Sequence, residues 1–304
     1  LQRVCHREPP IGCGQSPASY HHHPVRPIPL LLTLLLVLIG ACDRRPGTAP
    51  VERRAVSLTP AATDLILAFG ASAFLPGVTV FEGAARLASR PRVGDYESVD
   101  WDRIASLRPA VMFVQSDPAR LPQGMRDRAD QLGIELVVLR IDRLTDIIVE
   151  LDRIGLALGR AEEARKLLHQ IRERLEEVRT NVAAKPRVRT LLVIGASGTS
   201  AAGRETFLDD LLDIAGGTNA LSATGYLTID REKLVELAPD AIIQLMPDAR
   251  PGDLDTADRL WAGLSDVPAV RAGRVVRLTG PDVLKPGPAA ADLARQIAQA
   301  IHGN

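Results

Sequence analysis

The sequence has little of several residue types on which common protein functions depend. Of its 304 residues, three are Cys, six are His and 3% are aromatic. It contains no CxxC pair and no His/Asp/Glu cluster with metal-ligand spacing, which argues against a transition metal held by protein side chains. Lys plus Arg and Asp plus Glu both number 37, so the net charge is zero. A nucleic-acid partner, which usually requires a basic excess, therefore has no support.

Catalytic residue patterns are also scarce. After Cys42 only His169 and His302 remain as histidines, and neither lies near a nucleophile in the sequence. The stretch VIGASG follows a predicted strand, as a nucleotide-binding loop would, but it matches neither GxGxxG nor the GxSxG nucleophile elbow. The sequence favours a ligand-binding protein that is not an enzyme. The Gly195–Gly198 turn leaves one alternative, an extracytoplasmic α/β enzyme that uses this turn.

The longest apolar run lies near the N-terminus and is too short to cross a membrane. Residues 28–41 read IPLLLTLLLVLIGA and precede Cys42. A membrane-spanning helix needs about 20 apolar residues, whereas this run fits the hydrophobic region of a signal peptide. Its end, LIGAC, resembles a bacterial lipobox, in which Cys42 would carry the lipid. We therefore expect a signal peptide at 25–41 and a flexible tether at 42–52.

Residues 1–24 show no periodicity and fit none of these segments. No Met precedes Met112, and Val25 suits an alternative start codon, so residues 1–24 are expected to be untranslated or unstructured. Cys42 would then be the only cysteine of the mature chain, which leaves no intrachain disulfide.

Strands and helices alternate from residue 53 onward, which predicts an α/β fold with mostly parallel sheets. The expected parts are an N-terminal lobe at 53–143, a helical connection at 144–185 and a C-terminal lobe at 186–304. We expect two Rossmann-like lobes bridged by one long helix at 161–182, about 33 Å long at 1.5 Å per residue. In the first lobe, Asp64 falls in the early turns of a predicted helix, where its charge suits the helix dipole.

The bridging helix carries a single apolar stripe on one side and charged residues on the other. The apolar positions are Ala164, Leu167, Leu168, Ile171, Leu175, Val178 and Val182. Two i,i+4 ion pairs, Glu162–Lys166 and Arg172–Glu176, are expected on the solvent-exposed face.

Two stretches 130 residues apart have nearly the same pattern. VDWDRIASLRPAVMFVQ occupies 99–115 and IDREKLVELAPDAIIQL occupies 229–245. Each has an Asp, an apolar helix face, Leu-x-Pro and a hydrophobic run. This pattern indicates that the two lobes are related, although helix-then-strand units are similar in many proteins. Asp102 and Glu232 fall at equivalent places, in the first turn of a predicted short helix, where a carboxylate also offsets the helix dipole.

Seven phrases, in this order, resemble the class III substrate-binding proteins of ABC importers, the cobalamin and iron–siderophore class. They are RRAVSLTPAATDLILAFGA, LPGVTV, RVGDYESVDWDRIASLRPAVMFV, FLDDLLDIAGGTNAL, YLTIDREKLVELAPDAII, WAGLSDVPAVRAGRVVRL and KPGPAAADLA. The resemblance covers about residues 54–301 and implies two lobes, a rigid bridging helix and a ligand between the lobes. It implies a permease dimer and its ATPase as partners, a metal chelate as cargo, a monomeric protein and no cofactor of its own.

The resemblance also suggests which residues face the ligand and the permease. Rings after GVT, after RVG and before the second repeat would line the site, together with the start of the first helix and the loop before PGP. These ligand-binding candidates are Pro60, Phe81, Tyr96, Tyr226, Pro281, Asp282 and Lys285. The rings could equally be ordinary core or loop aromatics, and Lys285 either an anion partner or a solvated lysine. Asp102 and Glu232 would dock onto Arg pockets of the permease.

The cargo stays open at this point. The segment FEGAARL replaces the YCDYPP-like segment of cobalamin binders, which leaves cobalamin, ferric siderophores and haem as candidates. The expected location is extracytoplasmic and membrane-anchored, on the periplasmic face or the cell surface. A sensory ligand-binding lipoprotein without a permease is a further alternative.

Overall fold

The structure is a computed structural model that describes residues 53–303 except positions 84, 123, 199 and 248. The described residues belong to one compact unit, Pro50–Asn304. The expectations for residues 1–24, the signal peptide at 25–41, the tether at 42–52 and the lipid on Cys42 lie outside the described residues. Within them, no helix combines the length and apolar character needed to cross a membrane.

The N-terminal lobe is built on a four-stranded parallel sheet with the strand order β2-β1-β3-β4. Its strands are β1 (Ala55–Ser57), β2 (Gly77–Val78), β3 (Val111–Gln115) and β4 (Glu135–Leu139). Its helices are α2 (Pro60–Ala68), α3 (Trp101–Leu107) and α4 (Met125–Gln131). The side chains of β1 and most of β3 are buried, as expected for a parallel sheet covered on both faces. Strand β2 is short, and a 3-10 turn at Ser72–Phe74 precedes it.

The C-terminal lobe has a six-stranded, mostly parallel sheet with the order β10-β9-β5-β6-β8 and β7 paired to β5. Its strands are β5 (Val188–Ile194), β6 (Ser200–Ala202), β7 (Gly217–Asn219), β8 (Tyr226–Thr228), β9 (Ala241–Met246) and β10 (Val275–Thr279). Its helices are α7 (Phe207–Ile214), α8 (Arg231–Leu237), α9 (Pro251–Ala262), α10 (Pro268–Arg271) and α11 (Ala290–His302). Strands β6 and β8 pair antiparallel. These two strands, β7 and helix α10 were not predicted from the sequence.

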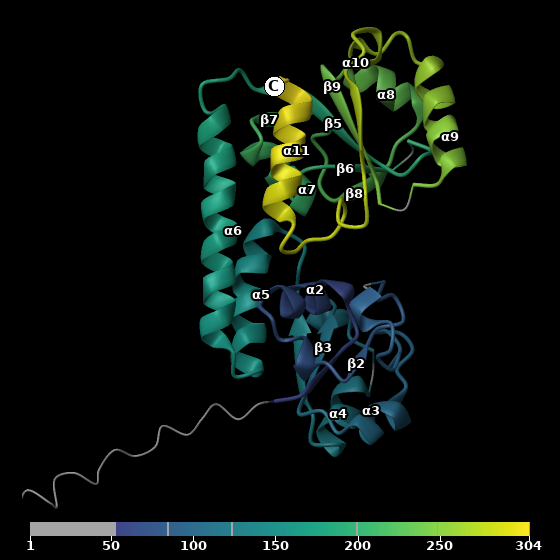
Figure 1. The fold of residues 1–304 in the computed structure, drawn as a ribbon. Helices are drawn as coiled ribbons and strands as arrows, with labels where there is room; N and C mark the ends of the chain where they lie inside the picture. The colour runs from purple at the N-terminus through teal and green to yellow at the C-terminus, as the bar shows by residue number, and fades with distance from the viewer. Residues whose placement is uncertain (1–52, 84, 123, 199, 248, 304) are drawn as a thin grey trace, which may run out of the picture. The chain divides into compact units, whose positions relative to one another are not determined.

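The long helix α6 spans Ala161–Val182, as predicted. It packs on α5 (Leu144–Ala157) near one end and on α11 near the other (Figure 1). Close contact with α5 depends on Gly155, where a Cβ would lie 2.5 Å from the Cβ of Ala164. On the exposed face, Lys166 Nζ lies 3.1 Å from Glu162 Oε1 as expected, whereas Glu176 pairs with Arg179 at 3.8 Å.

One hydrophobic core runs through both lobes. It includes residues of β1, β3 and β4 in the first lobe, of α5 and α6, and of α7, α11, β5 and β9 in the second. Two smaller clusters cover the other face of each sheet. Because close-packed interiors resist deformation, the shared core should limit the movement of one lobe relative to the other. Two α/β lobes joined by a long helix confirm the predicted fold class.

Candidate ligand-binding site

A cavity of about 620 Å³ opens at the carboxyl edge of the N-terminal sheet. Its lining residues come from the segments after β1, β2, β3 and β4: Leu58, Thr59, Pro60, Phe81, Tyr96, Gln115, Ser116, Asp117, Arg120, Leu139, Arg140, Ile141 and Asp142. In the strand order β2-β1-β3-β4, the chain leaves β1 toward β2 on one side and leaves β3 toward β4 on the other, so the switch point lies between β1 and β3. Open α/β sheets bind ligands outside the carboxyl ends of their strands at such a switch point.

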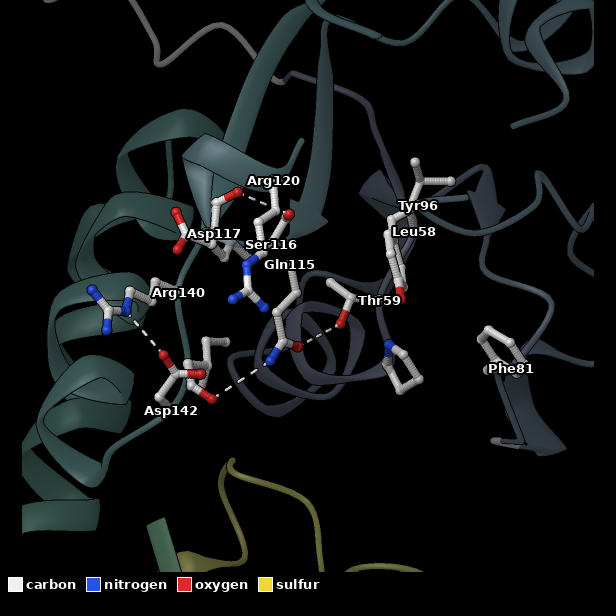
Figure 2. A pocket seen from close by; sticks show the side chains of 13 residues that line it. Leu58, Thr59, Phe81, Tyr96, Gln115, Ser116, Asp117, Arg120, Arg140 and Asp142 are labelled. Atoms are coloured by element: carbon white, nitrogen blue, oxygen red, sulfur yellow. Dashed lines mark hydrogen bonds and ion pairs between the residues drawn. The ribbon is translucent and has the colours of Figure 1, made fainter. Parts of the chain in front are cut away.

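Hydrogen bonds join the loops beneath this cavity. The hydroxyl of Ser57 donates to the carbonyl of Thr59 at 2.8 Å. The hydroxyl of Thr59 donates to Gln115 Oε1 at 3.0 Å, and the Gln115 amide makes a long contact of 3.5 Å to the Ile141 carbonyl (Figure 2). The ends of β1, β3 and β4 are therefore tied together, which gives the cavity a defined floor.

Phe81 and Tyr96 form an aromatic wall on one side of the cavity (Figure 2). Their side chains are 67% and 43% exposed, and exposed apolar groups that lie beside polar residues are typical of ligand-binding grooves. Tyr96 follows a tight turn in which Asp95 Oδ1 accepts the N–H groups of Glu97 and Ser98, at 2.9 and 2.8 Å. The neighbouring Glu97 carboxylate raises the pKa of Tyr96, so its phenol is protonated at neutral pH.

The opposite side of the cavity carries charged groups. Arg140 Nε donates to Asp142 Oδ2 at 2.9 Å, and this bond raises the pKa of Arg140. Asp117 Oδ1 accepts the N–H of Ala119 at 2.9 Å and so caps the 3-10 turn that ends at Arg120. The Arg120 guanidinium extends toward Gln115 (Figure 2). Sequence reasoning did not identify Gln115, Arg120 or Asp142, whose role depends on which loops meet at the sheet edge.

The structure brings together three of the seven predicted ligand residues, Pro60, Phe81 and Tyr96. Tyr226 lies on β8, is 56% exposed and is not among the residues that line this cavity. Partial burial raises the pKa of Tyr226, and the carboxylates of Asp142 and Asp210 raise it further. Tyr226 therefore lies within the electrostatic reach of Asp142, which lines the cavity.

Asp282 and Lys285 line a separate cavity of about 190 Å³ together with Asp64. Lys285 Nζ lies 3.4 Å from both Asp64 Oδ2 and Asp282 Oδ1. Asp64 lies in the early turns of α2, as expected, and its carboxylate also joins that helix to the loop before α11. Pro281 lines a third cavity, of about 290 Å³, which it shares with Asp282.

Opposing effects act on the charges of this cluster. Burial raises the pKa of Asp64 although the Lys285 ammonium lowers it, and Glu82 adds to the rise. Burial disfavours the charge on Lys285, but the carboxylates of Asp64 and Asp282 outweigh it and raise the pKa of Lys285. The ion pair is therefore partly desolvated, and its ammonium is the more firmly charged partner.

The two repeats have the same local structure in both lobes. Asp100 caps α3 by accepting the N–H of Arg103 at 3.0 Å, and Asp230 caps α8 by accepting the N–H of Lys233 at 2.8 Å. Both helices end in a residue with positive φ, 47° at Arg108 and 41° at Ala238. The predicted docking residues Asp102 and Glu232 are both exposed in the first turn of their helix.

The Gly195–Gly198 turn is packed against the interior of its lobe. Gln244 donates to the carbonyl of Gly195 at 2.8 Å and accepts the indole N–H of Trp261 at 2.9 Å. A Cβ at Gly198 would lie 2.2 Å from Leu260 Cδ2. The next described element is the strand β6, whereas nucleotide-binding turns lead into a helix N-terminus that binds phosphate. Among the described residues, no three His, Cys, Asp or Glu side chains gather as they would to hold a metal ion.

Comparisons with known proteins cover both lobes. The model of the family described as periplasmic binding protein matches residues 56–281. A vitamin B12-binding protein of Yersinia pseudotuberculosis is 22% identical over 247 residues, which cover 80% of this chain and 85% of that protein. A periplasmic haem-binding protein of Pseudomonas aeruginosa is 25% identical with a TM-score of 0.70, covering 82% of this chain and 92% of that chain. A periplasmic vitamin B12-binding protein of Vibrio cholerae is 21% identical with a TM-score of 0.69, covering 83% and 97% of the two chains.

Proposed function

The chain belongs to the periplasmic binding protein family, and on this premise we propose that it captures a metal chelate and delivers it to an ABC importer. The candidate ligands are cobalamin, haem and ferric siderophores. The observation that carries the proposal is the cavity at the sheet edge, with two exposed rings on one wall. Flat apolar contact from rings suits a large planar ligand and loses little conformational entropy. Relatives named for vitamin B12 and for haem support the same ligand class.

In this proposal, residues of the second lobe also contact the ligand. Tyr226 on β8 is exposed and lies in the electrostatic reach of Asp142. Lys285, Asp282 and Pro281 belong to the loop before α11, which pairs with α2 through Asp64. A ligand held mainly by Pro60, Phe81 and Tyr96 would then meet these residues at its outer edge.

Delivery depends on the repeated carboxylates in this proposal. Asp102 and Glu232 occupy matching positions on capped helices of the same length, one in each lobe. Two equivalent anionic points suit a permease made of two subunits with Arg pockets. The carboxylates of Asp100 and Asp230 already cap these helices, so Asp102 and Glu232 are not needed as caps. The importer's ATPase, a monomeric protein and a lipid anchor on Cys42 complete the proposal.

Titration of the purified protein with cobalamin, haem and several ferric siderophores tests the ligand class. Binding is read by ligand absorbance and by fluorescence of Trp101 and Trp261. We expect saturable binding of at least one of these chelates. A double Phe81→Ala, Tyr96→Ala variant should bind it at least about tenfold more weakly, because it loses two apolar contact surfaces.

Leu254→Ala is the matched control, since Leu254 is a large apolar side chain, 39% exposed, on α9. It should bind like the unmodified protein. Saturation by none of the chelates, or equal binding by the ring-deleted and control variants, would contradict the proposed site.

A further inference from the structure

Arg120 is the cavity-lining cation that lacks an ion-pair partner among the described residues. Arg140, which also lines the cavity, is engaged by Asp142 at 2.9 Å. Asp117, the carboxylate nearest in sequence, accepts the N–H of Ala119. No ion pair within residues 53–303, apart from the four undescribed positions, includes Arg120, and its side chain is exposed to the cavity.

The arrangement around Arg120 separates apolar from charged contacts. Phe81 lies across the cavity from it, and Gln115 stands between them on the floor (Figure 2). Gln115 Oε1 is already occupied by the hydroxyl of Thr59. A ligand resting on the aromatic wall would therefore present its edge to the guanidinium of Arg120.

We propose that Arg120 is a specificity-determining residue that binds a carboxylate at the edge of a flat metal chelate. The inference rests on the proposed function and names the substrate class of the same cavity: a chelate with free carboxylates. A guanidinium offers two parallel N–H groups that match a carboxylate, and such charge-assisted bonds are the strong ones. It offers less to a chelate whose carboxylates are esterified or amidated, because neither a full negative charge nor a second equivalent oxygen remains.

The fold supports the position of Arg120 without fixing its tip. Arg120 is the last residue of the 3-10 turn Pro118–Arg120, which begins with a proline. Asp117 Oδ1 caps this turn by accepting the N–H of Ala119. The backbone N–H of Arg120 donates to the Asp117 carbonyl at 2.8 Å. The backbone is thereby held at the cavity rim, whereas the long side chain can adjust to the ligand edge.

The test compares haem, which has two free carboxylates, with its dimethyl ester, which has none. Both are titrated into the unmodified protein and into Arg120→Gln, Arg120→Lys and Arg126→Gln variants. Arg126, on α4, is an exposed arginine outside the cavity and serves as the matched control. Melting curves of all four proteins establish that each is folded.

We expect Arg120→Gln to weaken haem binding by about tenfold to a hundredfold, as is typical for a hydrogen bond to a charged group. Affinity for the dimethyl ester should be unchanged by this substitution. Arg120→Lys should restore part of the haem affinity, because it keeps the charge but not the fork. Raising the salt concentration should weaken haem binding by the unmodified protein more than by Arg120→Gln.

Three outcomes would overturn the inference and leave the proposed function standing. Equal affinity of the unmodified protein for haem and for its dimethyl ester would show that the protein does not recognise the free carboxylates. Equal weakening of both probes by Arg120→Gln would assign Arg120 a structural role. Binding of cobalamin but of neither porphyrin would refute the carboxylate specificity and leave the proposed function standing, whereas binding of none of these chelates would refute both.

Discussion

Asp210 makes a contact between the lobes whose loss should lower the stability of the protein. Its Oδ2 accepts the Nε of Arg143 and the backbone N–H of Leu144, each at 2.9 Å, and Oδ1 pairs with a terminal nitrogen of Arg143. The carboxylate on α7 thus holds the first turn of α5. Nearby, the N–H of Phe207 donates to the carbonyl of Asp142 at 2.8 Å.

Asp210→Ala leaves the guanidinium of Arg143 and one backbone N–H without their acceptor. The Asp210 side chain is 16% exposed and that of Arg143 is 37% exposed. Hydrogen bonds to charged groups contribute about 1.5–3 kcal/mol each, and partial exposure reduces the value for Arg143. We expect the free energy of unfolding to fall by about 2–4 kcal/mol, which lowers Tm by roughly 4–12 °C for a chain of this size.

The assay is urea unfolding of both variants and the unmodified protein, with calorimetry for Tm. Asp213→Ala is the matched control, because Asp213 lies on the same helix and pairs with Arg187 at 2.6 Å, but is 62% exposed. An exposed ion pair typically contributes less than about 1 kcal/mol. If Asp210→Ala costs no more than Asp213→Ala, the reasoning that α7 anchors α5 through Asp210 is refuted.

Four further substitution experiments and one scattering measurement follow. Asp64→Asn should leave the free energy of unfolding at pH 7 unchanged or raise it, because the raised pKa of Asp64 means that folding disfavours its charge. Any gain in the free energy of unfolding over the unmodified protein should vanish in urea titrations as the pH falls below 3.8. Lys285→Met should instead lower stability at pH 7 by about 1–3 kcal/mol, since it leaves Asp64 without its cation. Gly94→Ala should disturb the turn that carries Tyr96 and weaken ligand binding. Gly94 has a φ of 96°, and a Cβ at this position would lie 2.0 Å from the Ser98 carbonyl oxygen. Normal ligand affinity of this variant would contradict the role of the turn in supporting Tyr96. Asp102→Ala with Glu232→Ala should abolish transport in cells while titrations of the purified protein stay normal, and intact transport would exclude docking through these carboxylates. Ligand binding should change the radius of gyration from small-angle scattering only slightly, since one hydrophobic core runs through both lobes. A large decrease in this radius, as expected if the lobes closed on the ligand, would contradict the prediction.

Long, regular patterns in the sequence predicted the corresponding elements well. The bounds of α6 agree with its apolar stripe, because a helix of 22 residues repeats the 3.6-residue hydrophobic period over several turns. Strands β6 and β8 have three residues each, too few for a period of two to be recognised. Helix α9 begins at Pro251, where Asp253 accepts the N–H of Arg250 at 2.9 Å, a capping contact that has no signal in a hydrophobic period.

The candidate site was only partly predictable. Phe81 and Tyr96 were found because aromatic residues are rare in this chain and can be considered one by one. Arg120 could not be singled out among the many arginines, because nothing in its own sequence neighbourhood shows that it faces those rings. Asp64 was interpreted from its helix alone, and its pairing with Lys285 across 221 positions has no local signal.

The sequence by itself determined the family, the two-lobed α/β class, the bridging helix and the repeat at 99–115 and 229–245. These features depend on local hydrophobic periodicity and on repeated sequence motifs, which can be recognised without the tertiary structure. Only the tertiary structure decided which loops form the cavity and which charges are left facing it. Those facts follow from the strand order β2-β1-β3-β4 and from packing between distant segments, which bring together residues that no local pattern connects.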